Sequence, residues 1–152
     1  MTQSRFIFAA AAGSFALLAG AFAFQHLGGL APCKMCIWQR YPHAIALALA
    51  AVAFFVPGGT LALAGAAAML VTAGVGGFHV GVEQGWWEGP STCSSGDISG
   101  LSTDALMDQI MSAPLVRCDE IAWSLAGISM AGWNAILSLL LCGFWIAAWR
   151  KA

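Results

Sequence analysis

The sequence predicts an all-α integral membrane protein, a four-helix transmembrane bundle with one long loop that carries a short amphipathic helix. Hydrophobic residues make up 60% of the 152 residues, and charged residues only 9%, whereas charged residues are roughly 25% of a typical soluble domain. So few charges could not cover the surface of a soluble domain. The 6 basic and 7 acidic residues also lack the basic excess of a nucleic-acid-binding protein, and the length suits a single membrane domain, residues 1–152.

Four apolar blocks are the basis for the predicted helices. A helix needs about 20 apolar residues to cross a hydrocarbon layer of ~30 Å. The blocks are residues 6–24, 37–56, 61–82 and 133–149. The second block stops at Pro57-Gly58-Gly59, a sequence that ends helices. None of the blocks alternates between apolar and polar residues, so we expect helices rather than strands there.

The first block has a second interpretation. Arg5, the apolar run and Ala21-Phe22-Ala23 resemble a cleavable signal peptide. However, the run of 19 apolar residues exceeds the ~7–15 that are usual in signal peptides. We therefore expect a retained span, and cleavage would leave three spans.

Four spans would place both termini on the same side of the membrane, but the basic residues do not orient the chain. The side with the termini holds Arg5, Arg150 and Lys151. The other side holds Lys34, Arg40 and Arg117. Three basic residues on each side leave the positive-inside rule undecided. If Arg40 lies within the second span, the count favours cytoplasmic termini.

The loop over residues 83–132 is long enough to have a function of its own. Within it, Ser102 or Thr103 can cap a helix, and Asp104 favours its first turn. The apolar side of this helix would carry Leu106, Met107, Ile110 and Met111. We expect an amphipathic helix over residues 102–111 that lies on the membrane surface. The alternative is an ordinary loop helix that packs on its own protein.

Cys33 and Cys36 form a Cys-x-x-Cys motif directly before the second span. This spacing lets two sulfurs cycle between dithiol and disulfide, and a helix N-terminus favours the thiolate. Arg40 follows Cys36 by four residues, one helical turn. Because arginine inside a span is costly, we expect Arg40 to stabilise a thiolate at Cys36. The alternative is an arginine that only anchors the helix at the interface.

Cys93 and Cys118, 25 residues apart in the loop, suit a disulfide in an oxidising compartment. Small polar residues surround Cys93, namely Ser91, Thr92, Ser94, Ser95 and Gly96. We therefore expect an exposed bond in a mobile loop, open to attack by another protein's thiolate. The alternative is a structural staple in a membrane scaffold without enzymatic activity.

Zinc is a further interpretation of these four cysteines. Zinc sites usually pair two closely spaced motifs, which the separation of Cys93 from Cys118 does not match. We therefore expect no metal. Cys142 lies within the fourth block and is expected to act as a small apolar residue in a helix interface.

The segment Pro32-Cys33-Lys34-Met35-Cys36-Ile37-Trp38-Gln39-Arg40 resembles the signature of DsbB-type disulfide bond formation proteins. These are four-span quinone reductases of the bacterial inner membrane. The resemblance covers essentially the whole chain, including the second, widely spaced cysteine pair in a long loop. Vitamin K epoxide reductase-type proteins also combine four helices with redox-active cysteines, but their Cys-x-x-Cys motif lies late in the chain.

The resemblance implies a route for electrons and the residues along it. The catalytic residues would be Cys33, Cys36, Cys93 and Cys118. A periplasmic thioredoxin-like protein of the DsbA type would attack Cys93, and Cys118 would then attack Cys33. Cys36 would deliver electrons to a membrane quinone, ubiquinone or menaquinone. Cys36 and Arg40 would bind that quinone, and His79 is a candidate hydrogen-bond donor to it. Both termini would be cytoplasmic and the redox loops periplasmic.

Overall fold

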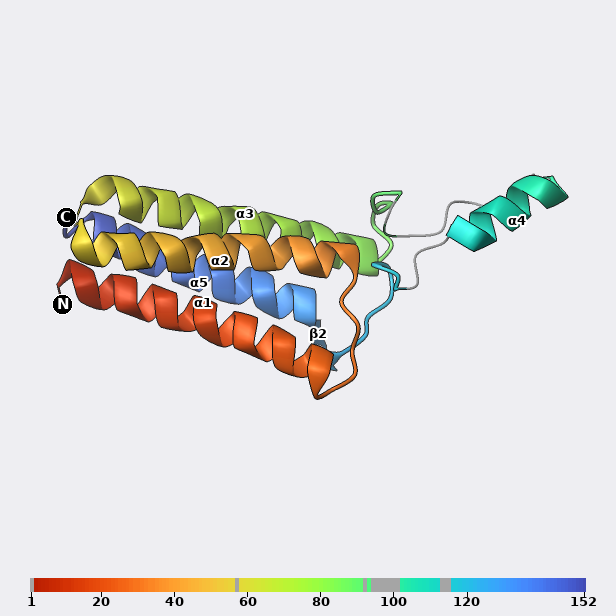
Figure 1. The fold of residues 1–152 in the computed structure, drawn as a ribbon, viewed down its shortest axis with the longest axis horizontal. Helices are drawn as coiled ribbons and strands as arrows, with labels where there is room; N and C mark the ends of the chain where they lie inside the picture. Colours follow the sequence, from red (N-terminus) through yellow and green to blue (C-terminus); the bar gives the residue numbers. More distant parts are fainter. Residues whose placement is uncertain (1, 57, 92, 94–101, 113–115) are drawn as a thin grey trace.

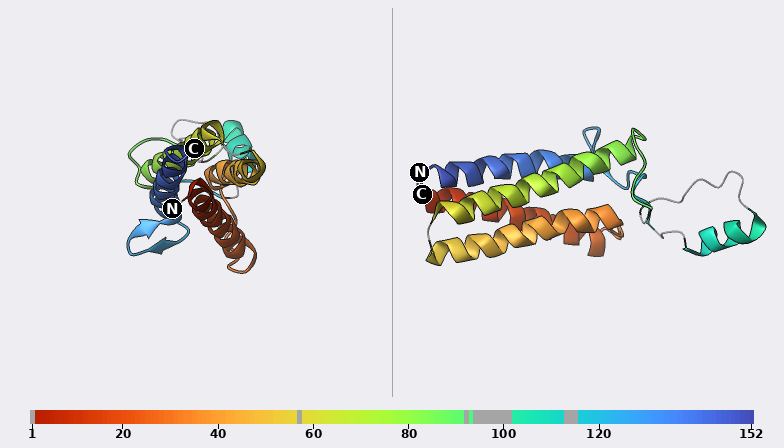
Figure 2. Two further views of the ribbon diagram at one scale, coloured as in Figure 1. Left: turned by 90° about the vertical axis from the view of Figure 1, so that its left-hand side faces the viewer. Right: turned by 90° about the horizontal axis from the view of Figure 1, so that it is seen from above.

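The computed structural model describes residues 2–56, 58–91, 93, 102–112 and 116–152. Four long helices lie side by side in a bundle: α1 (Gln3–His26), α2 (Lys34–Phe55), α3 (Gly59–Glu83) and α5 (Met130–Trp149) (Figure 1). Both termini lie at the same end of this bundle, and the long connection between α3 and α5 leaves from the other end (Figures 1 and 2). The helical fold class predicted from the apolar blocks is confirmed.

Three of these helices, α1, α3 and α5, are long and apolar enough to cross a membrane. The fourth, α2, has a comparable length of 22 residues, but its first half carries Lys34, Arg40 and His43. These polar residues are the reason that α2 is less apolar overall than its neighbours. Membrane crossing by α2 therefore stays a prediction, although α2 lies in the same bundle (Figure 2).

Small residues let the helices of the bundle pack closely. The fully buried indole of Trp145 in α5 lies against Gly65 of α3. A Cβ atom at Gly65 would come within 2.3 Å of the Trp145 ring, so only glycine leaves room for this contact. Close approach at small residues is typical of helices that pack in lipid.

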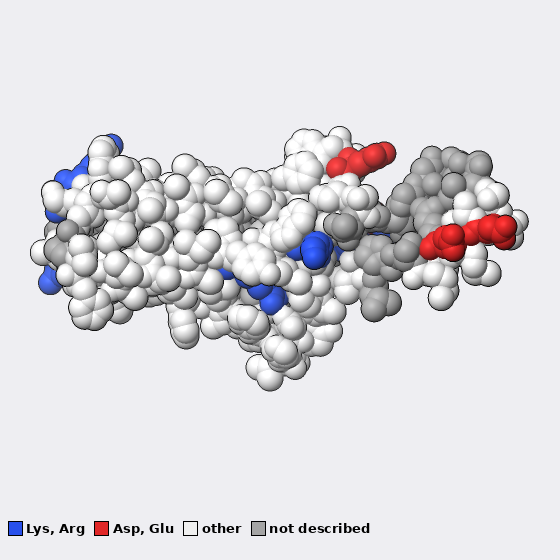
Figure 3. Space-filling view, turned by 45° about the horizontal axis from the view of Figure 1, so that its top comes forward, with Lys and Arg blue, Asp and Glu red and all other residues white. Residues whose placement is uncertain are grey.

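The outer surface of the bundle is apolar. Large hydrophobic side chains such as Phe15, Leu70 and Leu139 are more than half exposed. On the face shown in Figure 3, Lys and Arg lie toward the two ends of the bundle, and Asp and Glu lie only toward the loop end. A surface of this kind suits contact with lipid rather than with water.

The predicted loop helix is present as α4 (Thr103–Ser112). The Ser102 hydroxyl accepts a hydrogen bond from the Ala105 amide at 3.3 Å, so Ser102 caps the helix as expected. In Figures 1 and 2, α4 lies away from the four long helices. The apolar side chains of Met107, Ile110 and Met111 are exposed. Their contact with a membrane surface remains a prediction.

A small antiparallel hairpin, β1 (Ser124–Leu125) and β2 (Ile128–Ser129), precedes α5 and was not predicted from the sequence. Its turn residues Ala126 and Gly127 both have positive φ, 53° and 77°, as tight two-residue hairpin turns require. The Trp133 indole donates a hydrogen bond to the Leu125 carbonyl at 3.1 Å and ties the hairpin to α5. Strands of two residues are too short to show an alternating pattern.

Candidate redox site

The Cys-x-x-Cys motif begins α2. Cys33 is the N-cap residue, and its sulfur accepts a hydrogen bond from the Cys36 amide at 3.1 Å. Both residues are present as thiols, with Cys33 buried and Cys36 half-buried. A hydrogen bond between the two side chains, together with burial, raises the pKa of the Cys33 thiol. Cys33 is therefore the member of the reduced pair that keeps its proton.

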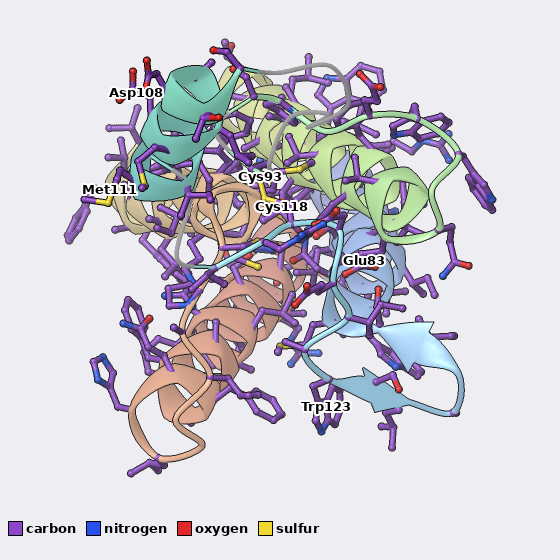
Figure 4. All side chains as sticks on the ribbon, turned by 90° about the vertical axis from the view of Figure 1, so that its right-hand side faces the viewer. Glu83, Cys93, Asp108, Met111, Cys118 and Trp123 are labelled. Carbon is purple, nitrogen blue, oxygen red and sulfur yellow. A yellow bond between two sulfur atoms is a disulfide. The ribbon has the colours of Figure 1, made fainter. Side chains whose placement is uncertain are left out.

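The second cysteine pair is a disulfide between Cys93 and Cys118. Figure 4, which looks onto the loop end of the bundle, shows both residues there, with α4 to one side. Both side chains are 0% exposed and pack with Cys33, Met35 and Val82. The prediction of an exposed bond was therefore wrong, because the bond is part of an apolar cluster. Of the small polar residues around Cys93, positions 92 and 94–96 lie outside the described residues.

The two cysteine pairs meet at His79 of α3. The sulfurs of Cys33 and Cys118 and a ring nitrogen of His79 all lie within 4.8 Å of one another. The His79 Nε2 atom is 3.7 Å from the Cys33 sulfur and 3.1 Å from the Cys118 carbonyl oxygen. Three residues that are far apart in the sequence thus form one buried cluster.

The same three residues are of the types that bind zinc. A thiol must lose its proton to become a metal ligand, and here the Cys118 sulfur is bonded to Cys93. The arrangement of the described residues thus suits sulfur exchange, and a four-cysteine zinc site would require both pairs to be reduced.

A cavity of about 400 Å³ lies between α1, α2 and α5, and Cys36 is part of its wall. The lining is predominantly apolar and includes Leu17, Phe24 and Trp123. The other polar or charged lining residues are Gln39, Arg40, His43, Trp133 and Asn134. An apolar cavity with a few polar groups is the usual form of a small-molecule site.

Arg40 is held in place on the wall of this cavity by α1. Its guanidinium donates hydrogen bonds to the Gln25 side chain at 2.6 Å and to the Ala21 carbonyl at 3.4 Å. It also lies 5.0 Å from the centre of the Phe22 ring, which is within range of a cation–π interaction. The positive charge is thus kept at the cavity, one helical turn beyond Cys36.

The two buried histidines differ in their relation to the large cavity. His79 is not among the described residues that line the large cavity, but it lines a smaller hollow together with Cys33 and Cys36, so its expected role as a donor to a quinone stays a prediction. His43, to which the sequence analysis gave no role, does line the cavity and is only 2% exposed. It contacts Asn134 at 3.0 Å and Ser14 at 3.3 Å. The available signal was a histidine within an apolar block, where polar residues are costly.

Comparisons with known proteins agree with this site. The family model of the disulfide bond formation protein DsbB matches residues 3–148. A protein of Verminephrobacter eiseniae named disulfide bond formation protein B is 38% identical over 83% of this chain and 76% of its own length. Its namesake in Methylococcus capsulatus is 34% identical over 90% of this chain and 88% of its own length. No solved structure matches. With its helical bundle, its apolar spans and its two cysteine pairs, the chain belongs to the DsbB family of disulfide bond formation proteins.

Proposed function

We propose that this protein, a single membrane domain over residues 1–152, re-oxidises a periplasmic thioredoxin-like protein of the DsbA type. It passes the electrons through its two cysteine pairs to a membrane quinone. One observation carries the proposal: the Cys118 sulfur lies within 4.8 Å of the Cys33 sulfur, while Cys36 lines a cavity. The relatives' name, disulfide bond formation protein B, supports a reaction that forms disulfides rather than one that reduces them.

The first exchange takes place at the loop pair. A thiolate of the reduced partner attacks the Cys93 sulfur, the Cys93–Cys118 bond breaks, and Cys118 leaves with the electron pair. The partner's second cysteine then attacks the mixed disulfide, so the partner departs oxidised and Cys93 is released as a thiolate. This sequence of steps is ordinary thiol–disulfide exchange.

The second exchange moves the reducing equivalents to the helix pair. Cys118 attacks the Cys33 sulfur of the oxidised Cys33–Cys36 pair, and Cys36 is released as a thiolate. Cys93 then attacks Cys118, which re-forms the loop disulfide and leaves Cys33 as a thiol. In this scheme, an oxidised loop pair beside reduced Cys33 and Cys36 is the state just before the electrons leave the protein.

The cavity beside Cys36 fits the head group of a quinone. Its volume of about 400 Å³ falls within the range of roughly 300–1,000 Å³ that is usual for small-molecule sites. A quinone, ubiquinone or menaquinone, supplies a two-electron acceptor that also takes up two protons. The Cys36 sulfur is the exit point for electrons, and Arg40 offers N–H donors on the same wall. The nearby charge of Arg40 favours the thiolate form of Cys36.

The redox chemistry would take place on the periplasmic side. We propose that both termini are cytoplasmic, that α2 crosses the membrane as the fourth span, and that α4 rests on the membrane surface. In this orientation the loop pair lies at the end of the bundle where α4 emerges (Figure 4), and Cys33 of the helix pair packs against it. A soluble partner then reaches the loop pair from the water, while the apolar acceptor reaches the cavity from the lipid.

The direct test mixes the purified protein with a reduced DsbA-type partner and a short-chain ubiquinone or menaquinone. Quinone absorbance and partner thiols are followed together. We expect one partner disulfide to form for each quinone reduced. The Cys142→Ala variant serves as control, because Cys142 lies within α5 and outside both pairs. A protein that leaves the partner reduced in the presence of either quinone would refute the proposal.

The alternative of a non-enzymatic scaffold makes a different prediction. Structural disulfides would resist mild reductant and form no mixed disulfide with the partner. A partner whose second cysteine is replaced by alanine cannot resolve a mixed disulfide. Accumulation of its covalent complex with this protein would therefore exclude the scaffold.

A further inference from the structure

His79 of α3 contacts both of the cysteines that take part in the exchange between the two pairs. Its Nε2 atom lies 3.1 Å from the Cys118 carbonyl oxygen and 3.7 Å from the Cys33 sulfur. Cys118 and Cys93 are joined to each other by their disulfide and by a hydrogen bond from the Cys118 amide to the Cys93 carbonyl. Among the described residues, the hydrogen bond from His79 is the one that connects this loop pair to a long helix.

The orientation of the His79 ring depends on the side chain of Gln39 in α2. The Gln39 Nε2 atom lies 3.2 Å from the Met35 carbonyl oxygen, and only an N–H group can bond there. The Gln39 Oε1 atom accepts a hydrogen bond from the Asn134 Nδ2 atom at 2.8 Å. Both contacts assign the same orientation to the Gln39 amide, so its nitrogen is the atom that faces His79.

This orientation determines which nitrogen of His79 carries the hydrogen. The Gln39 Nε2–H group donates to the His79 Nδ1 atom at 2.9 Å, so Nδ1 is the acceptor of a neutral ring and the hydrogen is on Nε2. The Glu83 carboxylate lies 3.9 Å from Nε2, beyond hydrogen-bond distance, and accepts a hydrogen bond from the Ser129 hydroxyl. The one N–H group of the ring is therefore donated to the main chain of Cys118.

A main-chain acceptor has a consequence for the exchange between the pairs. The carbonyl oxygen of Cys118 is the same group whether its sulfur is a thiolate or part of a disulfide, so this hydrogen bond does not depend on the redox state. The bond to Cys93, in contrast, breaks when a thiolate attacks the loop pair. Exchange requires two sulfurs in contact, and a geometry that is already held lowers the entropic cost of the reaction. The sulfurs of Cys118 and Cys33 lie within 4.8 Å of each other in the cluster with His79.

We propose that His79 is a positioning residue for the exchange between the pairs: it holds the main chain of Cys118 so that the Cys118 sulfur stays beside Cys33 after the loop disulfide has opened. In that step the Cys118 thiolate attacks the Cys33 sulfur, the Cys33–Cys36 bond breaks, and the electron pair leaves with Cys36. Gln39 acts one contact further away, because it orients the His79 ring. This role rests on the proposed function, in which Cys118 becomes a thiolate next to an oxidised helix pair.

The test measures how readily the Cys118 sulfur reaches Cys33 when neither partner nor quinone is present. A background protein with Cys93→Ala and Cys142→Ala keeps three cysteines, so that one disulfide leaves one thiol. The purified protein is oxidised with diamide, equilibrated, quenched with acid and alkylated. Peptide mass spectrometry then gives the ratio of the Cys33–Cys118 bond to the Cys33–Cys36 bond.

Four variants in this background separate positioning from a purely structural role. His79→Leu should lower the ratio about tenfold, the effect expected for the loss of one buried hydrogen bond. His79→Gln keeps an N–H donor that can reach the Cys118 carbonyl, and it should restore most of the ratio. Gln39→Leu leaves His79 in place but releases its orientation, so the ratio should fall even if His79→Leu fails to fold. His26→Leu, which replaces an exposed histidine at the end of α1, is the matched control and should keep the ratio of the background protein.

Specific outcomes would overturn this role of His79. If His79→Leu and Gln39→Leu both kept the background ratio, His79 would not hold Cys118 beside Cys33. An equal fall in His79→Gln and His79→Leu would refute the part of the N–H donor. A background protein that forms the Cys33–Cys36 bond alone would show that the Cys118 sulfur is not held within reach. Because the assay needs neither partner nor quinone, it tests His79 even if the proposed reaction with a DsbA-type protein fails.

Discussion

The two cysteine pairs of this protein have the same chemistry but are held in place by different means. Cys33 and Cys36 occupy the first turn of a long helix, where capping and neighbouring helices determine their positions. Cys93 and Cys118 lie in the connection between α3 and α5, on either side of α4, and are held together by their own bond. Cys93 and Cys118 also pack against Cys33, Met35 and Val82, so the loop pair rests on the end of the bundle. The comparison thus separates a pair positioned by helix structure from a pair positioned by a disulfide and by packing.

The two pairs also differ in their access to the cavity. Cys36 is part of its wall, whereas neither Cys93 nor Cys118 is among the described residues that line it. Under the proposed function, electrons from the loop pair would have to pass through the helix pair to reach an acceptor in the cavity. The following predictions test this division, beginning with the largest expected effect.

Replacement of Cys36 by serine should stop electron transfer to the quinone and leave the first exchange, at the loop pair, intact. We expect quinone reduction in Cys36→Ser to fall to the rate measured without protein, because the sulfur on the cavity wall is gone. The loop pair should still form a mixed disulfide with a DsbA-type partner that lacks its second cysteine. Quinone absorbance and gel analysis of the covalent complex measure the two steps, with Cys142→Ala as control. A fully active Cys36→Ser protein would contradict the proposed electron route.

Replacement of Arg40 should affect only the exit side. In Arg40→Met we expect quinone reduction to slow by on the order of 10²-fold, since a charge that favours the Cys36 thiolate is lost. Formation of the mixed disulfide at the loop pair should be unchanged. Steady-state quinone kinetics and a quenched-flow assay of the first exchange distinguish the two steps. Arg150→Met, at the opposite end of the bundle, is the control, and equal slowing of both steps would show that Arg40 is only structural.

Glycine substitutions in α3 test how rigidly the bundle holds the helix pair. Gly65→Ala should lower the free energy of unfolding by about 1–3 kcal/mol, a typical penalty for overpacking, because the new Cβ would collide with Trp145. Gly74→Ala is the matched control, since no atom outside the local helix backbone lies within 4 Å of its Cβ position. Thermal unfolding in detergent measures both variants. Equal stability of the two would mean that the contact between α3 and α5 is looser than described.

Loss of the ion pair next to Cys118 should have the smallest effect of these changes, and only on the stability of the loop. The Arg117 guanidinium bonds both carboxylate oxygens of Asp119 and holds the pKa of that carboxyl below its usual range. A lowered pKa contributes stability above the usual value of 3.8 that is lost as the pH falls through the lowered value. The pair is partly exposed, so Asp119→Asn should destabilise the loop by less than ~1 kcal/mol.

Hydrogen exchange at the Cys118 amide, which donates to the Cys93 carbonyl at 2.8 Å, measures this local stability. The difference between wild type and Asp119→Asn should shrink as the pH falls below 4, where the carboxylate becomes protonated. Glu88→Gln, another exposed acid of the loop, is the control. If Asp119→Asn changed hydrogen exchange more at low pH than at neutral pH, the ion pair of Asp119 with Arg117 would not be the source of this stability.

Much of the bundle could be predicted because its signals are local. The apolar blocks at residues 6–24, 37–56, 61–82 and 133–149 all lie within observed helices, apart from Val56 at the end of α2. The cap at Ser102 and the helix start after Cys33 were also predictable, because capping depends on side chains within one turn. The hairpin at residues 124–129 gave no comparable signal, since each strand has only two residues.

The sequence by itself determined the helical membrane fold, the spacing of the cysteines and the place of Cys33 at the start of a helix, because these depend on neighbours along the chain. Only the tertiary structure decided that the loop disulfide is buried, that His79 lies beside Cys33 and Cys118, and that His43 and Asn134 share a cavity wall with Cys36. These contacts join residues 39 to 91 positions apart. They depend on the rotation of each helix about its axis and on packing against its neighbours, which the apolar pattern of a single block leaves open.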